Sequence, residues 1–139
     1  MNRNLTIAVA ATLAAASITI AAGCGSDSAE VPTGADLKGT WTQAGAGFEQ
    51  GESITWNNPT IVIEKADGQG FAGFKEYTPS GGGSPQKEAI NGVIGPDGDI
   101  LITDEDGFIE GTYADGVITG QYAETGADSA AINVTITKK

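Results

Sequence analysis

A nine-residue unit occurs twice in succession near the end of the chain, as GFIEGTYAD at 107–115 and GVITGQYAE at 116–124. Each copy has an isoleucine, a glycine and a tyrosine spaced two residues apart, so that all three share one face of a β-strand. The Asp115-Gly116 step between the copies supplies the positive φ angles that a tight hairpin turn requires. The repeat therefore predicts an antiparallel hairpin with both aromatic residues on the same face.

Further strands of this kind are expected along the rest of the chain, because it has 21 glycines and shows no sustained helical periodicity. Alternating apolar residues bounded by turn residues predict eight strands. These strands are 39–43, 60–65, 70–77, 87–94, 99–103, 107–113, 116–122 and 130–137. The segment 53–56 is either a further strand fragment or a bulged continuation of the first strand.

The even spacing of the strands favours an all-β, antiparallel up-and-down meander. Eight strands are enough to close such a meander into a small β-barrel without exposed edges. A β-sandwich is the alternative architecture. Long loops are predicted at 44–59 and 78–86, after odd-numbered strands, whereas the turns after even-numbered strands are short. The long loops should thus surround a mouth at one end, and the chain should enter the first strand and leave the last strand at the opposite, closed end.

Residues 1–23 have the organisation of an export signal, with Arg3 in a short polar segment followed by an uncharged stretch over 5–22. Small residues then precede Cys24, which is the only cysteine in the chain. The segment IAAGC resembles the lipobox of bacterial lipoproteins, which implies cleavage before Cys24 and acylation of its sulfur. Such an anchor would hold the protein on the extracytoplasmic side of a cell-envelope membrane. An uncleaved anchor and a free thiol after ordinary cleavage are the alternatives.

The remaining chain is interpreted as a lipidated flexible linker at 24–36, rich in small and polar residues, and one β-barrel domain at 37–139. Loss of Arg3 with the signal would lower the formal charge from −11 to −12, which disfavours binding to nucleic acid. The chain has no histidine and no second cysteine, so it lacks the usual general base, the usual transition-metal ligand and a disulfide framework.

No arrangement of nucleophile and base is apparent in the sequence, and we expect neither enzymatic activity nor a cofactor. Lys75 and Glu76 are neighbours on one predicted strand, so only one of them can face the bore. The segment Asp104-Glu105-Asp106-Gly107 is interpreted as a solvated acidic turn. A calcium loop is the less favoured interpretation, because Asp104 and Asp106 do not fit the spacing of EF-hand ligands.

The first predicted strand contains LKGTW, and the later strands repeat its Gly-x-aromatic step as IEGTY and ITGQY. Over about 37–137 this pattern resembles the avidin and lipocalin superfamily of barrels, the calycins. The resemblance implies that Gly39 and Trp41 close the barrel floor and that 78–86 is a lid. Biotin binding is not implied, because Trp56 is the only other tryptophan and the last strand, AAINVTIT, contains no acid.

The predicted inward faces of the later strands carry no charge, so we expect the barrel to bind a small apolar or aromatic ligand. The expected contacts are Phe48, Trp56, Tyr113 and Tyr122. Glu49 and Glu52 lie in the predicted first long loop, which either forms a ligand lid or packs over the mouth. The alternative function is a protein-interaction module of the cell envelope, such as an inhibitor or assembly factor, that acts through its loops.

Overall fold

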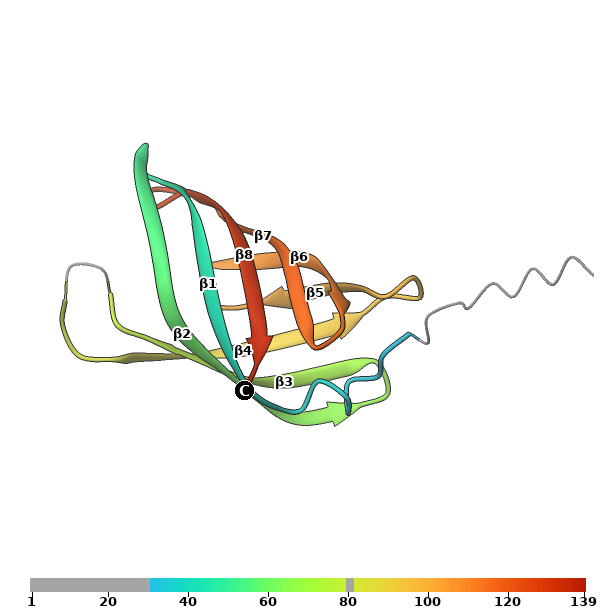
Figure 1. Ribbon diagram of the computed structural model, residues 1–139. Coiled ribbons are helices and arrows are strands. Elements are labelled where there is room, and N and C mark those ends of the chain that lie inside the picture. Colours follow the sequence, from blue (N-terminus) through green and yellow to red (C-terminus); the bar gives the residue numbers. More distant parts are fainter. Residues whose placement is uncertain (1–30, 80–81) are drawn as a thin grey trace, which may run out of the picture.

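A computed structural model describes residues 31–79 and 82–139, and in it a single antiparallel sheet closes on itself with the strands in sequence order (Figure 1). The predicted eight-stranded barrel is thus confirmed, and the sandwich alternative is excluded. The strands are β1 (Gly39–Glu49), β2 (Glu52–Asp67), β3 (Gly70–Tyr77), β4 (Gln86–Ile94), β5 (Asp99–Thr103), β6 (Gly107–Ala114), β7 (Val117–Glu124) and β8 (Ala130–Lys138). The predicted signal peptide and Cys24 lie outside the described residues.

The first hairpin is the main difference between prediction and structure. A long loop was predicted at 44–59, but β1 continues to Glu49 and β2 begins at Glu52, which leaves a two-residue turn. Gln50 and Gly51 occupy this turn with φ values of 50° and 83°. The result is a long β1–β2 hairpin that rises above the rest of the barrel at the mouth (Figure 1).

Strand pairing explains why this segment is extended despite its weak apolar pattern, with pairing on both sides for 44–49 and with β1 alone for 52–57. β1 pairs with β2 along one edge and with β8 along the other, as far as Glu49 opposite Ala130. The turn is also fixed to the loop before β8. The Gln50 amide nitrogen donates a 2.9 Å hydrogen bond to the Ser129 carbonyl, and the Gln50 Nε2 donates one of 2.6 Å to Asp128 Oδ1. The long hairpin is therefore a hydrogen-bonded part of the sheet that forms one side of the mouth, and it is not a loop.

The closed end is built around Trp41, which is fully buried. Its Nε1 donates a 2.8 Å hydrogen bond to the carbonyl of Leu37, which is also fully buried, and its ring meets the edge of Tyr113 at a centroid distance of 6.3 Å. The chain enters β1 and leaves β8 at this end, because the Lys139 amide donates a hydrogen bond to the Thr40 carbonyl at 2.9 Å. The predicted entry into the first strand and exit from the last strand at the closed end are thus confirmed.

The segment before β1 belongs to the packed structure as well. Asp36 Oδ2 accepts hydrogen bonds from the Thr33 backbone nitrogen at 2.8 Å and from its hydroxyl at 2.7 Å, which closes a turn. Gly34 is buried and its amide donates to the Gly68 carbonyl at 2.9 Å, while Val31 packs against the core. Ordered structure therefore begins before Leu37, inside the segment that the sequence predicted as linker.

The bore between the mouth and the closed end is filled by apolar side chains, as the alternation of residues in the later strands predicted. Each predicted inward branched residue is at most 4% exposed. These residues are Ile100, Ile102, Ile109, Ile118, Ile132, Val134 and Ile136. The repeat glycines Gly111 and Gly120 are directly paired, and a Cβ on Gly120 would lie 2.2 Å from the Glu110 carbonyl oxygen. These glycines thus let two backbones approach closely.

Candidate functional site: a polar cavity at the barrel mouth

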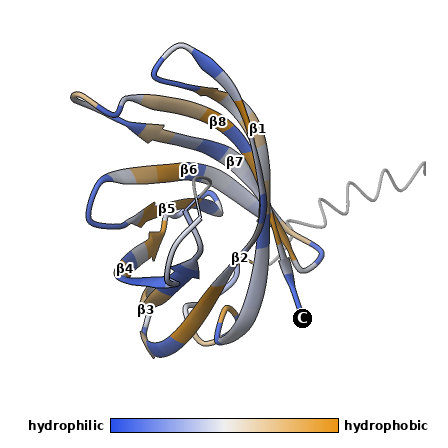
Figure 2. Cartoon of the chain, turned by 90° about the vertical axis from the view of Figure 1, so that its left-hand side faces the viewer, coloured by the Kyte–Doolittle hydropathy of each residue, from blue (hydrophilic) through white to orange (hydrophobic). Residues whose placement is uncertain are grey.

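A cavity of about 690 Å³ opens at the mouth, the end that faces the viewer in Figure 2. Its volume lies within the range of about 300–1,000 Å³ that is typical of small-molecule sites. We call this space the mouth cavity, and the residues that line it are mostly polar or charged. They are Gln43, Glu49, Thr55, Trp56, Asn57, Pro59, Lys75, Tyr77, Thr78, Pro79, Gln86, Glu88, Asp106, Tyr122, Glu124 and Asp128.

Two of the predicted ligand contacts, Trp56 and Tyr122, meet in the mouth cavity. Their ring centroids are 4.9 Å apart and their planes are inclined by 59°. Trp56 comes from β2 and Tyr122 from β7, two strands that β1 and β8 separate in the sheet. The curvature of the barrel therefore brings together two aromatic side chains that are far apart in the sequence, and we refer to them as the aromatic pair.

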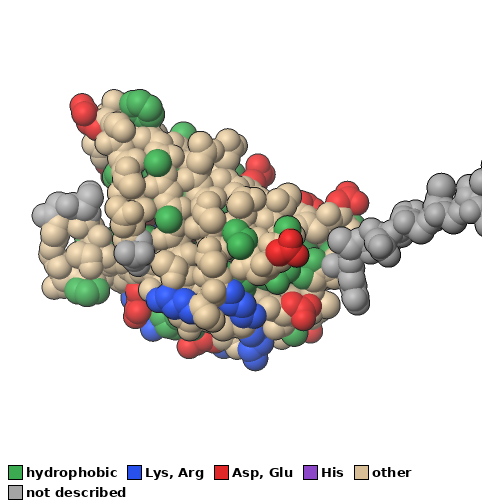
Figure 3. Space-filling model, in the orientation of Figure 1, with side chains coloured by type: hydrophobic (Ala, Val, Ile, Leu, Met, Phe, Trp, Pro, Cys, Tyr) green, Lys and Arg blue, Asp and Glu red, His purple; other side chains and the backbone are tan. Residues whose placement is uncertain are grey.

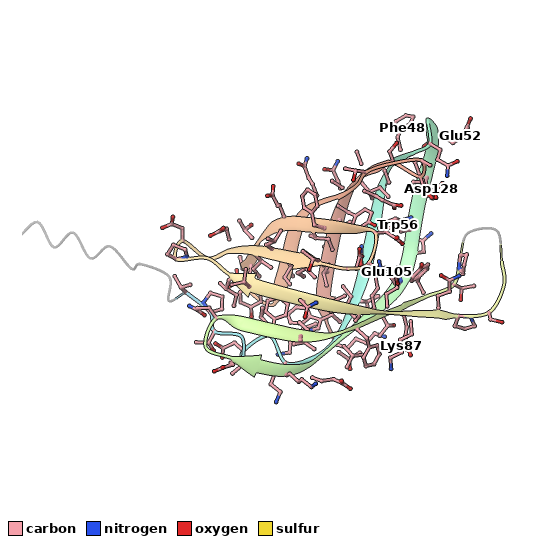
Figure 4. All side chains as sticks on the ribbon, turned by 180° about the vertical axis from the view of Figure 1, so that it is seen from behind. Phe48, Glu52, Trp56, Lys87, Glu105 and Asp128 are labelled. Atoms are coloured by element: carbon pink, nitrogen blue, oxygen red, sulfur yellow. The ribbon has the colours of Figure 1, made fainter. Side chains whose placement is uncertain are left out.

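The other two predicted contacts do not line the cavity. Phe48 is 61% exposed and lies at the tip of the long hairpin, beside Glu52 (Figure 4). Residues alternate sides along a strand, so Phe48 must face outward where its neighbour Glu49 lines the cavity. Tyr113 packs on Trp41 at the floor instead, because it lies next to the β6–β7 turn at the closed end. The two tyrosines of the repeat thus lie at opposite ends of the barrel.

A buried ionic cluster lies at the inner end of the cavity. It consists of Lys75, Glu88 and Asp104, and we call it the lysine cluster. Lys75 Nζ is 3.0 Å from Glu88 Oε2 and 2.5 Å from Asp104 Oδ2. The three side chains are 11%, 9% and 5% exposed. Glu88 Oε1 also accepts a hydrogen bond from the Tyr77 hydroxyl. The inner faces of β3 and β4 therefore carry charge, whereas the predicted uncharged inner face holds for the residues assigned to it on the later strands, β5 to β8.

Asp104 also corrects the prediction of a fully solvated acidic turn. Its Oδ1 accepts hydrogen bonds from the backbone nitrogens of Gly107 at 2.8 Å and Asp106 at 3.2 Å, which hold the carboxylate toward Lys75. Glu105, by contrast, is exposed, in agreement with the prediction. Glu76 is exposed as well, so only Lys75 of that neighbouring pair enters the bore.

The protonation states of the lysine cluster follow from its geometry. Burial alone would lower the pKa of Lys75, but the carboxylates of Asp104 and Glu88 overcome this effect and the pKa is raised. Lys75 is therefore an ammonium at neutral pH. Burial, followed by the nearby carboxylates, raises the pKa of both Tyr77 and Tyr122, so their phenols stay protonated.

Gln43 contributes an unpaired amide to the cavity. Its residue is only 1% exposed, yet neither Nε2 nor Oε1 has a hydrogen-bond partner among the residues that the structure describes. Glu88 Oε2 likewise makes no well-aligned hydrogen bond, although its 3.0 Å approach to Lys75 is a close ion pair. Buried polar groups are normally paired, because an unpaired one costs about 1–3 kcal/mol. Gln43 is thus positioned to bind something that enters the cavity.

Four carboxylates line the cavity near the ends of β1 and β7 and in the loops before β6 and β8, and we call them the acidic rim: Glu49, Asp106, Glu124 and Asp128. Burial raises the pKa of Glu124. The carboxylates of Asp106, Glu49 and Asp128 raise it further, against a 3.2 Å hydrogen bond from the Tyr122 hydroxyl that lowers it. Over the face in Figure 3, acidic side chains are scattered while lysines gather along the lower edge.

Neither a metal centre nor a membrane-spanning helix is found in the part of the chain that the structure describes. Within residues 31–79 and 82–139, no group of three or more His, Cys, Asp or Glu side chains is placed to hold a metal ion. In the same residues, no helix is long and apolar enough to cross a membrane.

No protein-family model matches the chain, and no curated protein matches it. The geometry and chemistry of the mouth cavity are therefore the basis for a proposal about function.

Proposed function

We propose that this protein is a lipid-anchored binding protein of the cell envelope whose barrel holds a small organic molecule in the mouth cavity. The observation that carries the proposal is the unpaired amide of Gln43, which is buried at the wall of a 690 Å³ cavity. A barrel that served only as a structural unit would gain stability from an apolar side chain at this position. The retained amide supports a ligand with hydrogen-bonding groups.

The polar lining changes the class of ligand that the sequence predicted. Isoleucine side chains fill the bore toward the closed end, so a ligand can bind only at the mouth. There, charged side chains and the aromatic pair line the same cavity. The ligand therefore combines a ring or alkyl body, which contacts Trp56 and Tyr122, with polar groups that reach Gln43. A purely apolar molecule would leave Gln43 unpaired and would displace water from the carboxylates without replacing its hydrogen bonds.

A Gln43→Met variant tests the proposal. Without ligand, it should unfold at a higher urea concentration, with a gain of about 1–3 kcal/mol, because an unpaired buried amide is removed at nearly constant volume. Native mass spectrometry of protein purified from its own cells should show a bound small molecule in the wild type and a reduced fraction in the variant. A destabilised variant would instead assign Gln43 a structural role, and a wild type without any bound molecule would contradict the proposal.

The alternative function, a protein-interaction module, would use the tip of the long hairpin. Phe48 is 61% exposed there and has Glu52 beside it (Figure 4). A Phe48→Ala variant separates the two functions, because it should leave the bound molecule in place. The alternative would be favoured if the wild type binds a stoichiometric protein partner and no small molecule, and if the Phe48→Ala variant loses that partner.

The anchor is proposed from the sequence, since Cys24 precedes the described residues. Its support from the fold is the point of entry, because the chain reaches β1 at the closed end, opposite the mouth. A tether from the membrane to this end would leave the mouth cavity directed away from the bilayer and accessible from solution.

A Cys24→Ala variant should move from the membrane fraction to the soluble fraction, because this residue would supply the whole acyl attachment. Cell fractionation followed by immunoblotting measures the shift, and Ser26→Ala, which keeps the cysteine, should stay in the membrane. Retention of Cys24→Ala in membranes after a carbonate wash would show that another segment holds the protein there.

A further inference from the structure

We propose that the ligand of the mouth cavity is an organic cation, an amine or quaternary ammonium that also carries a hydrogen-bonding group. This inference rests on the proposed function and specifies its ligand. It starts from the charges that line the cavity. Five carboxylates lie there, from the acidic rim and Glu88, and among the described lining residues Lys75 is the single base.

The charge of Lys75 is already neutralised inside the lysine cluster. Its Nζ contacts carboxylate oxygens of both Glu88 and Asp104, at 3.0 Å and 2.5 Å, so the cluster as a whole is negative. Lys75 therefore has no charge to offer an anionic ligand. The acidic rim has no such counter-ion within the lining, and an incoming cation would supply it.

Glu49, Asp106 and Asp128 lie close enough to Glu124 to disfavour the charge of its carboxylate. The raised pKa of Glu124 reflects burial first and then its carboxylate neighbours. A cation held among them would relieve this repulsion. The carboxylates come from separate strands and loops, and no described group of three converges on one point as metal coordination requires. An extended organic cation therefore suits this arrangement better than a metal ion.

The aromatic pair and Gln43 define the rest of the ligand. Trp56 and Tyr122 present ring surface to the cavity, and aromatic faces attract cations by up to about 2 kcal/mol when water is excluded. The Lys75 ammonium lies 5.6 Å from the Tyr122 ring centroid, which is an example of such a contact within this site. Gln43 offers one acceptor and one donor group, so the ligand should carry a complementary hydroxyl or amide.

Three molecules of similar size test the inference: 2-phenylethylamine, 2-phenylethanol and 3-phenylpropionate, which are a cation, a neutral molecule and an anion at neutral pH. Calorimetric titration of the full-length protein in a neutral detergent compares their affinities at low salt. We expect the amine to bind at least about tenfold more tightly than the alcohol, and the carboxylate to bind most weakly. Added salt should reduce the advantage of the amine.

Variants connect the selectivity to the site. Combining Glu49→Gln with Glu124→Gln should bring the amine close to the affinity of the alcohol, whereas Glu52→Gln, an exposed acid of the same hairpin outside the cavity, should leave the ratio unchanged. Trp56→Ala should weaken the binding of both molecules. Equal binding of amine and alcohol, or tighter binding of the carboxylate, would overturn the inference while the proposed function stands. If none of the three binds, the inference also fails, and the proposed function fails with it only if native mass spectrometry finds no bound molecule in the wild type.

Discussion

Replacing Lys75 with methionine should destabilise the barrel by about 3–5 kcal/mol at neutral pH, because it leaves two buried carboxylates without their shared cation. Glu88 and Asp104 are 9% and 5% exposed and both contact the Lys75 ammonium. Urea unfolding followed by tryptophan emission measures the loss. The matched control is Lys87→Met, which removes an exposed pair with Glu76 at 3.9 Å and should cost less than about 1 kcal/mol.

Lys75 also determines how the stability depends on pH. Its raised pKa means that the folded protein keeps this proton to higher pH than the unfolded chain does. The stabilisation is therefore complete below the unfolded pKa and is lost as the pH rises through the folded pKa. In Lys75→Met, two carboxylates stay buried without their cation, and this is the cause of the expected loss of stability. Adding Glu88→Gln and Asp104→Asn should recover the stability at neutral pH. A loss below about 1 kcal/mol in the single variant would contradict this account.

Trp41→Ala should cost about 3–5 kcal/mol, because it removes a fully buried ring and leaves a cavity at the barrel floor. The carbonyl of Leu37 also loses the hydrogen bond from the indole nitrogen, and Tyr113 loses its edge contact. Equilibrium unfolding in urea gives the magnitude. Phe48→Ala is the control, because Phe48 is 61% exposed and its removal should change stability by no more than about 0.5 kcal/mol.

An equal effect of the two substitutions would mean that the floor does not depend on the tryptophan. Near-ultraviolet circular dichroism adds an independent signal, because the indole of Trp41 is held rigidly against Leu37 and Tyr113. That signal should weaken in Trp41→Ala and persist in Phe48→Ala.

Most of the barrel could be predicted because the alternation of apolar and polar residues in its strands identifies which side chains face inward. Isoleucines alternate along β5 to β8, and turns such as Asp115-Gly116 mark where the chain reverses. The predicted bounds of β3 to β8 agree with the structure to within two residues. The segment 44–59 could not be predicted in this way, because its small and polar residues form strands only through pairing, 44–49 with β2 and β8 and 52–57 with β1. Tertiary pairing overrides a weak local preference there.

The site was predicted in part, and the reasons differ from residue to residue. Trp56 and Tyr122 stood out as aromatic residues, whereas Gln43 and Glu88 were missed although alternation with Trp41 and Ile90 places them inward. They were missed because they are polar, and the bore was expected to be lined by apolar side chains. The burial of Asp104 has no local signal, because it depends on a lysine on another strand.

The seam that closes the barrel joins the first strand to the last, with Trp41 opposite Lys138 and Glu49 opposite Ala130. A chain that emerges with its N-terminus first must therefore hold β1 with one free edge until nearly all later residues have arrived. Contacts so distant in sequence form slowly, because a long loop must close before the pairing contributes stability. The open-sided intermediate, with unpaired edges on β1 and β8, is the stage at which this protein is most exposed to proteases and to association with other chains.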